Sequence, residues 1–215
     1  MDIIQRKEIN KMVDILKLIS ELDGNKDKEV KSFDQLVDHY QCYNERNLVL
    51  GDIGPELAVA VDSVIRFWNK VDEGTPIEER QPIKVYIHSP GGYLTSAFSI
   101  IDSIKLSKTP VHTIAIGEVY SGGFFIFLAG DKKFSYPHAS FLYHEGATAN
   151  GGDANKFRNF AKFYEIQLEQ LKQVVLKNSG ITEAEYEKHI KDDWWLTAEE
   201  AVSYGIADEV LTELI

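Results

Sequence analysis

Apolar and polar positions along the chain predict short strands and amphipathic helices in turn from about residue 46 onward. Short apolar runs rich in β-formers predict strands, and apolar residues three or four apart predict helices. Strands are expected at 48–50, 84–87 and 113–116, and helices at about 56–71 and 94–104. Apolar strands alternating with helices predict an α/β fold with a mainly parallel sheet, its strands buried on both faces.

A long helix is predicted over residues 153–178 by an apolar stripe at helical spacing. The stripe consists of Phe157, Phe160, Ala161, Tyr164, Leu168, Leu171 and Val175. Phe163, Ile166 and Val174 fall outside it, so more than one face is apolar and the helix needs more than one packing partner. Burial within its own domain and contact with another copy of the chain both remain open.

Two capping boxes predict helix starts in the C-terminal part of the chain. Thr182 with Glu185, and Thr197 with Glu200, each place a hydroxyl three residues before a carboxylate. This arrangement satisfies the free N–H groups at a helix start. Gly205 is expected to close the last short helix.

Residues 1–30 are expected to form a separate N-terminal part, and residues 31–215 the main domain. Helical spacing predicts an amphipathic helix over residues 3–22, and the charged stretch 25–29 predicts a solvated linker. The helix is expected either to pack on its own domain or to contact another subunit, and the pattern leaves both open.

Composition narrows the classes of function. The 215 residues suit one compact domain, and their net charge of −11 argues against a nucleic-acid partner, because phosphates are bound mainly by Lys and Arg. No apolar run is long enough to span a membrane, and charged residues interrupt the N-terminal apolar pattern, so a cytoplasmic location is expected. One cysteine allows no internal disulfide, and no Cys/His cluster has zinc spacing.

Ser121 is the first candidate for chemistry. It stands between a predicted strand and the very apolar segment 124–130, and Gly122 and Gly123 follow it directly. A serine at a helix start lies near free N–H groups that stabilise negative charge, and the neighbouring glycines let a substrate backbone approach closely. The alternative is that the hydroxyl only caps the helix.

Three further segments carry candidate groups. Gly91 and Gly92 follow a strand and can present backbone N–H groups to an oxyanion, or can serve only the turn. His144 ends an apolar strand run and can reach a neighbouring nucleophile, or can be a satisfied buried histidine. Asp193 precedes two tryptophans. Their side chains are expected to be buried and to leave the Asp193 carboxylate partly shielded from water; the alternative is that Asp193 is a solvated loop residue.

Taken in order, these segments resemble the proteolytic subunit of the Clp protease over about residues 45–212. That family has a Ser-Pro-Gly-Gly turn, a serine segment, a histidine strand, an acid segment and an Ala-x-Glu-Ala-x-x-Tyr-Gly stretch. Each motif alone is weakly specific, whereas five in the right order and at compatible spacing are specific. Here they stand at residues 88–92, 119–123, 142–145, 192–194 and 198–208.

The resemblance implies Ser121, His144 and Asp193 as a catalytic triad, with the N–H groups of Gly92 and Gly122 as the oxyanion hole. It implies a spiral fold of repeated ββα units with a long handle helix, the fold shared by crotonases. It also implies polypeptide substrates, homo-oligomeric rings that enclose the active sites, and a AAA+ unfoldase as a partner. The chemistry of such a triad requires no metal or organic cofactor.

The chain departs from the family pattern at several positions, so it is expected to resemble a divergent or phage-type member of that family. Gly122 replaces the usual methionine after the serine, His88 replaces an asparagine, and Val119 and Tyr120 replace alanines. The alternatives are a crotonase-type acyl-CoA hydratase or isomerase, a relative of membrane-associated signal-peptide peptidases, and a catalytically silent ring subunit. Absence of a predicted membrane segment argues against the second, and an intact triad argues against the third.

Overall fold

The computed structural model describes residues 41–42, 44–146 and 153–215. The predicted N-terminal helix and linker, and the expected boundary after residue 30, lie outside these residues. Residues 46–215 form one compact unit, and its elements follow the order β1 (Asn47–Leu50), α3 (Pro55–Val71), the short 3-10 helix η1 (Ile77–Glu79), β2 (Ile83–Ser89), α4 (Leu94–Leu106), β3 (Val111–Tyr120), α5 (Gly122–Leu128), β4 (Lys132–Ser135), β5 (Ser140–Tyr143), α6 (Ala154–Asn178), α7 (Glu183–His189), β6 (Trp194–Thr197), α8 (Ala198–Ser203) and β7 (Glu209–Val210).

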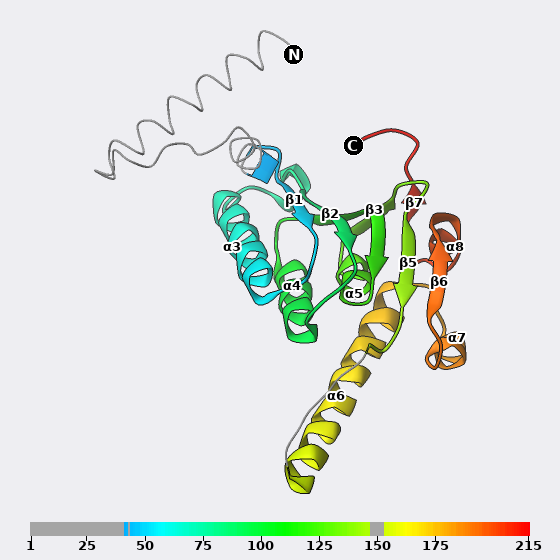
Figure 1. Cartoon of the computed structure of the whole chain (residues 1–215). Coiled ribbons are helices and arrows are strands. Elements are labelled where there is room, and N and C mark those ends of the chain that lie inside the picture. Colours follow the sequence, from blue (N-terminus) through cyan, green and yellow to red (C-terminus); the bar gives the residue numbers. More distant parts are fainter. Residues whose placement is uncertain (1–40, 43, 147–152) are drawn as a thin grey trace, which may run out of the picture. The chain divides into compact units, whose positions relative to one another are not determined.

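The strands form one mainly parallel sheet, as the sequence predicts (Figure 1). Its order is β1-β2-β3-β4-β7, and β3 also pairs with β5, which pairs with β6. Among these pairings only that of β5 with β6 is antiparallel. The α/β class is therefore confirmed, and each of the first three strands is followed by a helix.

The prediction that the strands are buried on both faces is wrong for β2. Ile83, Val85 and Ile87 are fully buried, while Lys84 and Tyr86 are half-buried. This alternation shows that helices cover one face of β2 much more completely than the other.

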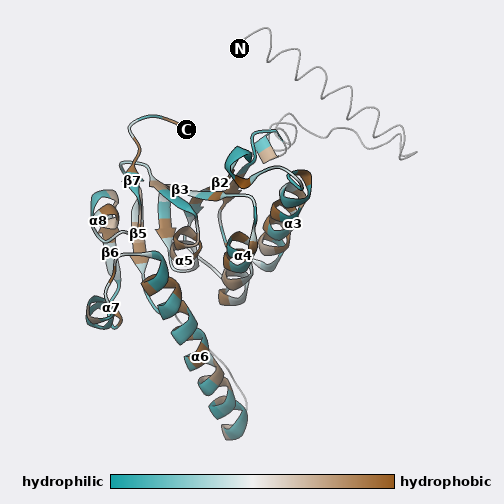
Figure 2. Ribbon diagram, turned by 180° about the vertical axis from the view of Figure 1, so that it is seen from behind, coloured by the Kyte–Doolittle hydropathy of each residue, from teal (hydrophilic) through white to brown (hydrophobic). Residues whose placement is uncertain are grey.

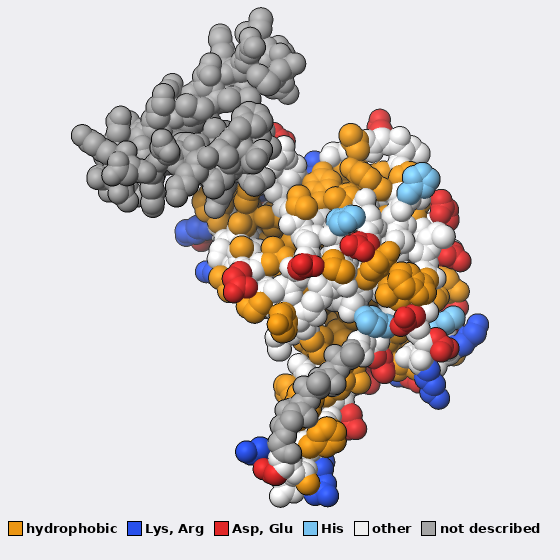
Figure 3. All heavy atoms as spheres, viewed as in Figure 1, with side chains coloured by type: hydrophobic (Ala, Val, Ile, Leu, Met, Phe, Trp, Pro, Cys, Tyr) orange, Lys and Arg blue, Asp and Glu red, His pale blue; other side chains and the backbone are white. Residues whose placement is uncertain are grey.

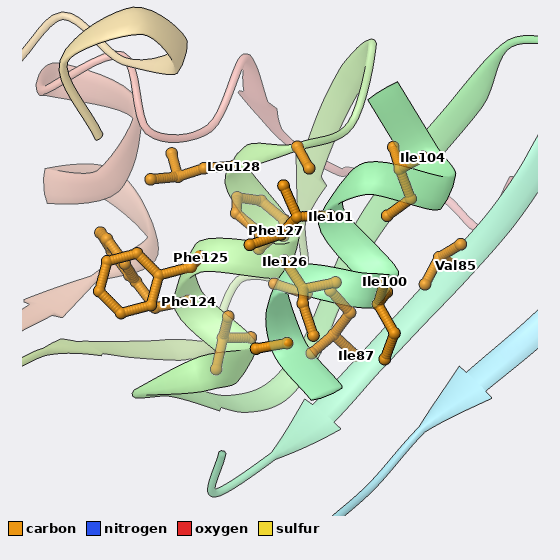
Figure 4. Close-up of a cluster of buried hydrophobic side chains, with 14 of the residues drawn as sticks. Val85, Ile87, Ile100, Ile101, Ile104, Phe124, Phe125, Ile126, Phe127 and Leu128 are labelled. Atoms are coloured by element: carbon orange, nitrogen blue, oxygen red, sulfur yellow. The ribbon is translucent and has the colours of Figure 1, made fainter. Parts of the chain in front are cut away.

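The core lies between the sheet and helices α4 and α5, where isoleucine and phenylalanine side chains pack together (Figure 4). Every residue of α5 is buried, which explains why its sequence is almost wholly apolar. The helix starts directly after Ser121, so its complete burial fixes the backbone at that serine.

Helix α6 extends away from the sheet, and both ribbon views show this (Figures 1 and 2). The apolar stripe of α6 is fully buried only near the C-terminal end of the helix, at Leu171 and Val175. Phe157 is 55% exposed, and Phe163 and Ile166 are each 57% exposed. Burial within the domain is therefore the wrong explanation for the first half of the helix.

Both capping boxes are confirmed, at Thr182 with Glu185 and at Thr197 with Glu200.

Among the described residues, no helix is long and apolar enough to cross a membrane.

Candidate active site

Ser121 occupies a sharp turn between β3 and α5. Its backbone angles are φ 52° and ψ −120°, a conformation that non-glycine residues rarely adopt. Its N–H donates a hydrogen bond to the carbonyl oxygen of Leu142 at 3.0 Å. The hydroxyl accepts no hydrogen bond from the N–H groups of α5, so the explanation that Ser121 is only a helix cap is wrong. The strained turn leaves its side chain available for another partner.

The pairing register of three strands brings the predicted triad residues to one edge of the sheet. Tyr120 of β3 pairs with Leu142 of β5, so the next residue on β3 lies beside the end of β5. Tyr143 of β5 pairs antiparallel with Trp194 of β6. Ser121, His144 and Asp193 each lie one residue beyond these pairs, so backbone pairing gathers them despite their distance along the chain.

The His144 and Asp193 side chains face each other across this edge. His144 Nδ1 lies 3.9 Å from Asp193 Oδ1, which is longer than a hydrogen bond. Ser121 and His144 line the same pocket, although within the described ranges no hydrogen bond joins their side chains. The structure thus brings all three predicted residues close together, although no hydrogen bond joins their side chains.

The expected burial of the two tryptophans beside Asp193 is wrong for the second of them. Trp194 is half-buried and stacks on His189 with ring centroids 4.0 Å apart, whereas Trp195 is 56% exposed. The Asp193 side chain is 62% exposed and is not drawn out of water. His144, with a side chain 33% exposed, is not a buried structural histidine either.

The Gly91-Gly92 turn packs directly against the Ser121 turn. Gly91 has φ +105°, and a Cβ atom there would lie 2.7 Å from the Cβ of Ser121. A Cβ on Gly92 would lie 2.2 Å from the carbonyl oxygen of Ile53, with which Gly92 forms a β-bridge. Only glycine fits at either position, and this close packing sets the turn beside the serine.

Gly92 and Gly122, the predicted oxyanion-hole residues, lie side by side. A Cβ atom on Gly122 would lie 3.6 Å from the backbone nitrogen of Gly92. In the part of the chain that the structure describes, neither N–H has a hydrogen-bond partner. Both glycines line the pocket that holds Ser121 and His144, so two free donors lie next to the serine.

That pocket has a volume of about 480 Å³ and extends from Ser121 to the inner side of α6. Phe125 and Leu171 contribute apolar wall, and Glu145 and Gln167 contribute polar groups. Tyr164 Oη donates a hydrogen bond to the backbone oxygen of Glu145 at 3.1 Å, which joins the end of β5 to α6. A larger cavity of about 1030 Å³ between α3 and α4 includes none of the predicted site residues.

A buried tyrosine pair supports the strand end that carries His144. Tyr143 Oη donates to Tyr186 Oη at 2.7 Å, which connects β5 to α7. Burial, followed by this hydrogen bond, raises the pKa of Tyr143 well above its ordinary value. The phenol therefore stays neutral, and the pair acts as a fixed support for His144. Among the described residues, no group of three or more His, Cys, Asp and Glu side chains could hold a metal ion.

Glu145 and Gln167 also line this pocket and were not predicted from the sequence. One signal was present for Gln167, because it lies three residues after Tyr164 and four before Leu171 on the predicted helix. That spacing puts an amide on the same face as an apolar stripe. Glu145 gave no comparable signal, because its exposure depends on how α6 packs.

Comparison with known proteins identifies similar chains. The family model of the Clp protease matches residues 74–214, a range that contains all five predicted site residues. The ATP-dependent Clp protease proteolytic subunit 2 of Treponema denticola is 29% identical over 191 residues, which cover 87% of this chain and 92% of that protein. The ATP-dependent Clp protease proteolytic subunit of Pleurastrum terricola is 29% identical over 181 residues, covering 82% and 89%.

Proposed function

The chain belongs to the Clp protease family, and on this premise we propose that it is a serine endopeptidase whose triad is Ser121, His144 and Asp193. The observation that carries the proposal is the strand register that gathers these three residues at one sheet edge. The unpaired hydroxyl of Ser121 and the two free N–H groups beside it add support. Residues 31–215 are proposed as the peptidase domain.

Hydrolysis would proceed through an acyl-enzyme. His144 takes the proton of the Ser121 hydroxyl while the oxygen attacks the carbonyl carbon of the scissile bond. The protonated imidazole then gives this proton to the leaving amine, and the C–N bond breaks. Water, activated by the same imidazole, attacks the ester, and the serine is released as the acid product leaves.

Asp193 would orient the imidazole. Because Nδ1 is the ring nitrogen that faces Asp193, Nε2 is left for the Ser121 hydroxyl. The 3.9 Å separation has to shorten into a hydrogen bond when substrate is bound, as catalytic contacts commonly do. The carboxylate then holds the correct tautomer and stabilises the imidazolium that forms.

The N–H groups of Gly92 and Gly122 would stabilise the oxyanion of the tetrahedral intermediate. Because both donors are free and their positions are fixed by packing, they need little reorganisation when charge develops. Losing one such donor typically raises the barrier by about 3 kcal/mol.

Polypeptides are the proposed substrates, cleaved inside a homo-oligomeric ring chamber. The relatives' names describe ATP-dependent proteolytic subunits, and this sequence has no Gly-x-x-x-x-Gly-Lys-Ser/Thr loop of its own. A separate AAA+ unfoldase is therefore the proposed source of ATP hydrolysis. Access for folded substrates would depend on that partner, whereas short peptides would reach the site unaided.

Substitution of the nucleophile tests the proposal. Ser121→Ala should reduce cleavage of a quenched fluorogenic peptide by at least about 10⁴-fold, because no other group replaces the attacking oxygen. Peptide turnover by purified protein is the measurement. Ser63→Ala, which changes an exposed serine on α3, is the matched control and should keep full activity.

Cleavage retained in Ser121→Ala would reject the nucleophile assignment. A wild-type chain that cleaves no peptide would instead favour a catalytically silent ring subunit.

A further inference from the structure

The Asp193 side chain has no contact of its own that fixes its position. It is 62% exposed, and in the described part of the chain its carboxylate accepts no hydrogen bond. It directly precedes β6, which pairs only with β5 in the described sheet. A triad requires its acid at a defined place beside the imidazole, because small displacements of catalytic groups are costly. The position of Asp193 therefore has to come from the residues next to it.

His189, the last residue of α7, holds the chain on both sides of Asp193. Its carbonyl oxygen accepts a hydrogen bond from the N–H of Asp192 at 3.2 Å. Its imidazole stacks on the indole of Trp194, with ring centroids 4.0 Å apart and ring planes within 10° of parallel. One residue thus makes a backbone contact just before Asp193 and a side-chain contact just after it.

Trp194 has two further contacts that make it a firm support. Tyr204, the residue after α8, meets the indole edge-on, with centroids 5.0 Å apart and planes at 83°. The backbone of Trp194 pairs with that of Tyr143 between β6 and β5. The indole is therefore held by aromatic side chains of two separate elements while its backbone lies in the sheet.

Helix α7 supports the neighbours of both the base and the acid of the triad. Tyr186 and His189 lie three residues apart on α7, so their side chains share one face of the helix. Tyr186 accepts the hydrogen bond of Tyr143, the residue before the base. His189 stacks on Trp194, the residue after the acid. Both ribbon views show α7 at the end of β6 where these contacts lie (Figures 1 and 2).

We propose that His189 is a positioning residue of the active site, which sets the place of Asp193 beside His144 by stacking on Trp194. The proposal rests on the proposed peptidase function of the same site. His189 does not line the pocket that holds Ser121, so it acts through Asp193 and not on the substrate. Without the stack the start of β6 can shift, the carboxylate moves away from the imidazole, and the base is oriented less well.

A matched pair of variants at His189 tests the proposal. His189→Leu has a side chain of similar size without a planar face, whereas His189→Phe keeps the face. We expect His189→Leu to lower kcat for a fluorogenic peptide at least about tenfold with KM unchanged, because only the orientation of the base is affected. His189→Phe should retain most of the wild-type kcat. Lys188→Leu, at an exposed position of the same helix, is the control and should keep full activity.

A double-mutant cycle separates the positioning of Asp193 from general support of the fold. The readout is the rate at which a fluorophosphonate probe labels Ser121, since this rate reports activation of the hydroxyl and can be followed for hours in slow variants. His189→Leu should slow labelling in the wild-type chain but not in the Asp193→Ala chain, where no acid is left to position. A loss through misfolding would appear in both chains, so the cycle decides the question even if stability falls.

The outcomes separate this proposal from the one beneath it. Activity of His189→Leu equal to that of Lys188→Leu, or no recovery in His189→Phe, would overturn the role of His189 and leave the peptidase assignment intact. Equal slowing by His189→Leu with and without the carboxylate of Asp193 would do the same. Absence of Ser121-dependent cleavage and labelling in the wild-type chain would overturn both proposals.

Discussion

Gly91 determines where the Ser121 side chain can lie. The two residues come from different turns, and a Cβ atom on Gly91 would meet the Cβ of Ser121 at 2.7 Å. It would also meet the backbone of Tyr120 and Gly122 at 3.0 and 3.1 Å. Because these contacts are with backbone, the neighbours cannot move aside cheaply.

Replacing Gly91 should therefore damage both stability and catalysis. Gly91→Ala adds a steric conflict and imposes φ +105° on a residue with a side chain, so we expect a loss of about 1–3 kcal/mol in the free energy of unfolding. Peptide turnover should fall at least tenfold, since Ser121 is displaced. Urea unfolding and turnover are the measurements.

Gly51→Ala is the control for this change, because nothing lies within 4 Å of a Cβ atom there. It should have little effect on either quantity. Activity in Gly91→Ala equal to that of Gly51→Ala would contradict the tight packing of the two turns.

At this scale the sequence indicated Ser121, His144 and Asp193 through motif order, and the structure brings them together. The separation of 3.9 Å and the exposure of Asp193 could not be predicted, because both depend on how the β6 segment leaves the sheet edge. Trp195 illustrates the cause: its aromatic character predicted burial, but its strand is paired only with β5 in the described sheet.

At the scale of elements, one arginine ties the starts of several strands together. The Arg46 guanidinium donates to both carboxylate oxygens of Asp72 at 2.7 and 2.8 Å, and to the carbonyl oxygen of Gln81 at 2.7 Å. The Thr109 hydroxyl donates to the same carboxylate at 2.7 Å. Arg46 precedes β1, Asp72 follows α3, Gln81 precedes β2 and Thr109 precedes β3, so the buried pair fixes four chain segments.

This pair makes stability depend on pH in a defined direction. The hydrogen bond from Arg46 holds the pKa of Asp72 below its usual range, and the Thr109 hydroxyl acts in the same sense against the effect of burial. The stabilisation is complete above the unfolded pKa, about 4, and is lost as pH falls toward the lower folded pKa.

Asp72→Asn leaves a buried guanidinium without its anion, so we expect a loss of about 3–5 kcal/mol at pH 7. The variant should also show a shallower fall in stability between pH 5 and pH 3, roughly the interval in which the carboxylate takes up its proton. Urea unfolding across this range is the measurement. Glu73→Gln, which alters an exposed pair with Lys70, should change stability much less, and equal effects would contradict the account.

The helices were easier to predict than the short strands. Capping boxes and helical spacing are local signals, and they placed α3, α4, α6 and α8 to within a few residues. Strands β4 and β6 were not predicted, because Lys132 and Lys133 hide the apolar character of β4 and the acid-tryptophan segment of β6 suggested a loop. Each becomes a strand by pairing with a distant partner, β3 for β4 and β5 for β6.

At the scale of the whole molecule, the outer half of α6 stands apart from the body with apolar side chains exposed. In Figure 3 hydrophobic atoms lie along this projecting part, with charged atoms at its tip. Phe163 and Ile166 are both more than half exposed within the described unit. Exposed apolar surface of this kind marks an interaction site, and the ring assembly proposed above would supply a second copy of the chain as its partner.

Polar substitutions on this surface should weaken the assembly. Phe163→Ser combined with Ile166→Ser removes apolar contact area, so we expect a smaller native mass at the same protein concentration. Native mass spectrometry or analytical ultracentrifugation measures this change, and Glu165→Gln on the same helix is the control. If the double variant keeps the wild-type mass, α6 is not the contact between copies.

Labelling with a fluorophosphonate probe, followed by mass mapping of the modified peptide, tests the central claim most directly. The probe reacts with a serine hydroxyl that a neighbouring base has activated. We expect a single adduct on Ser121 in the wild-type chain and no adduct in the folded His144→Ala variant. An adduct on another serine, or equal labelling of Ser121 without the imidazole of His144, would contradict the proposed triad.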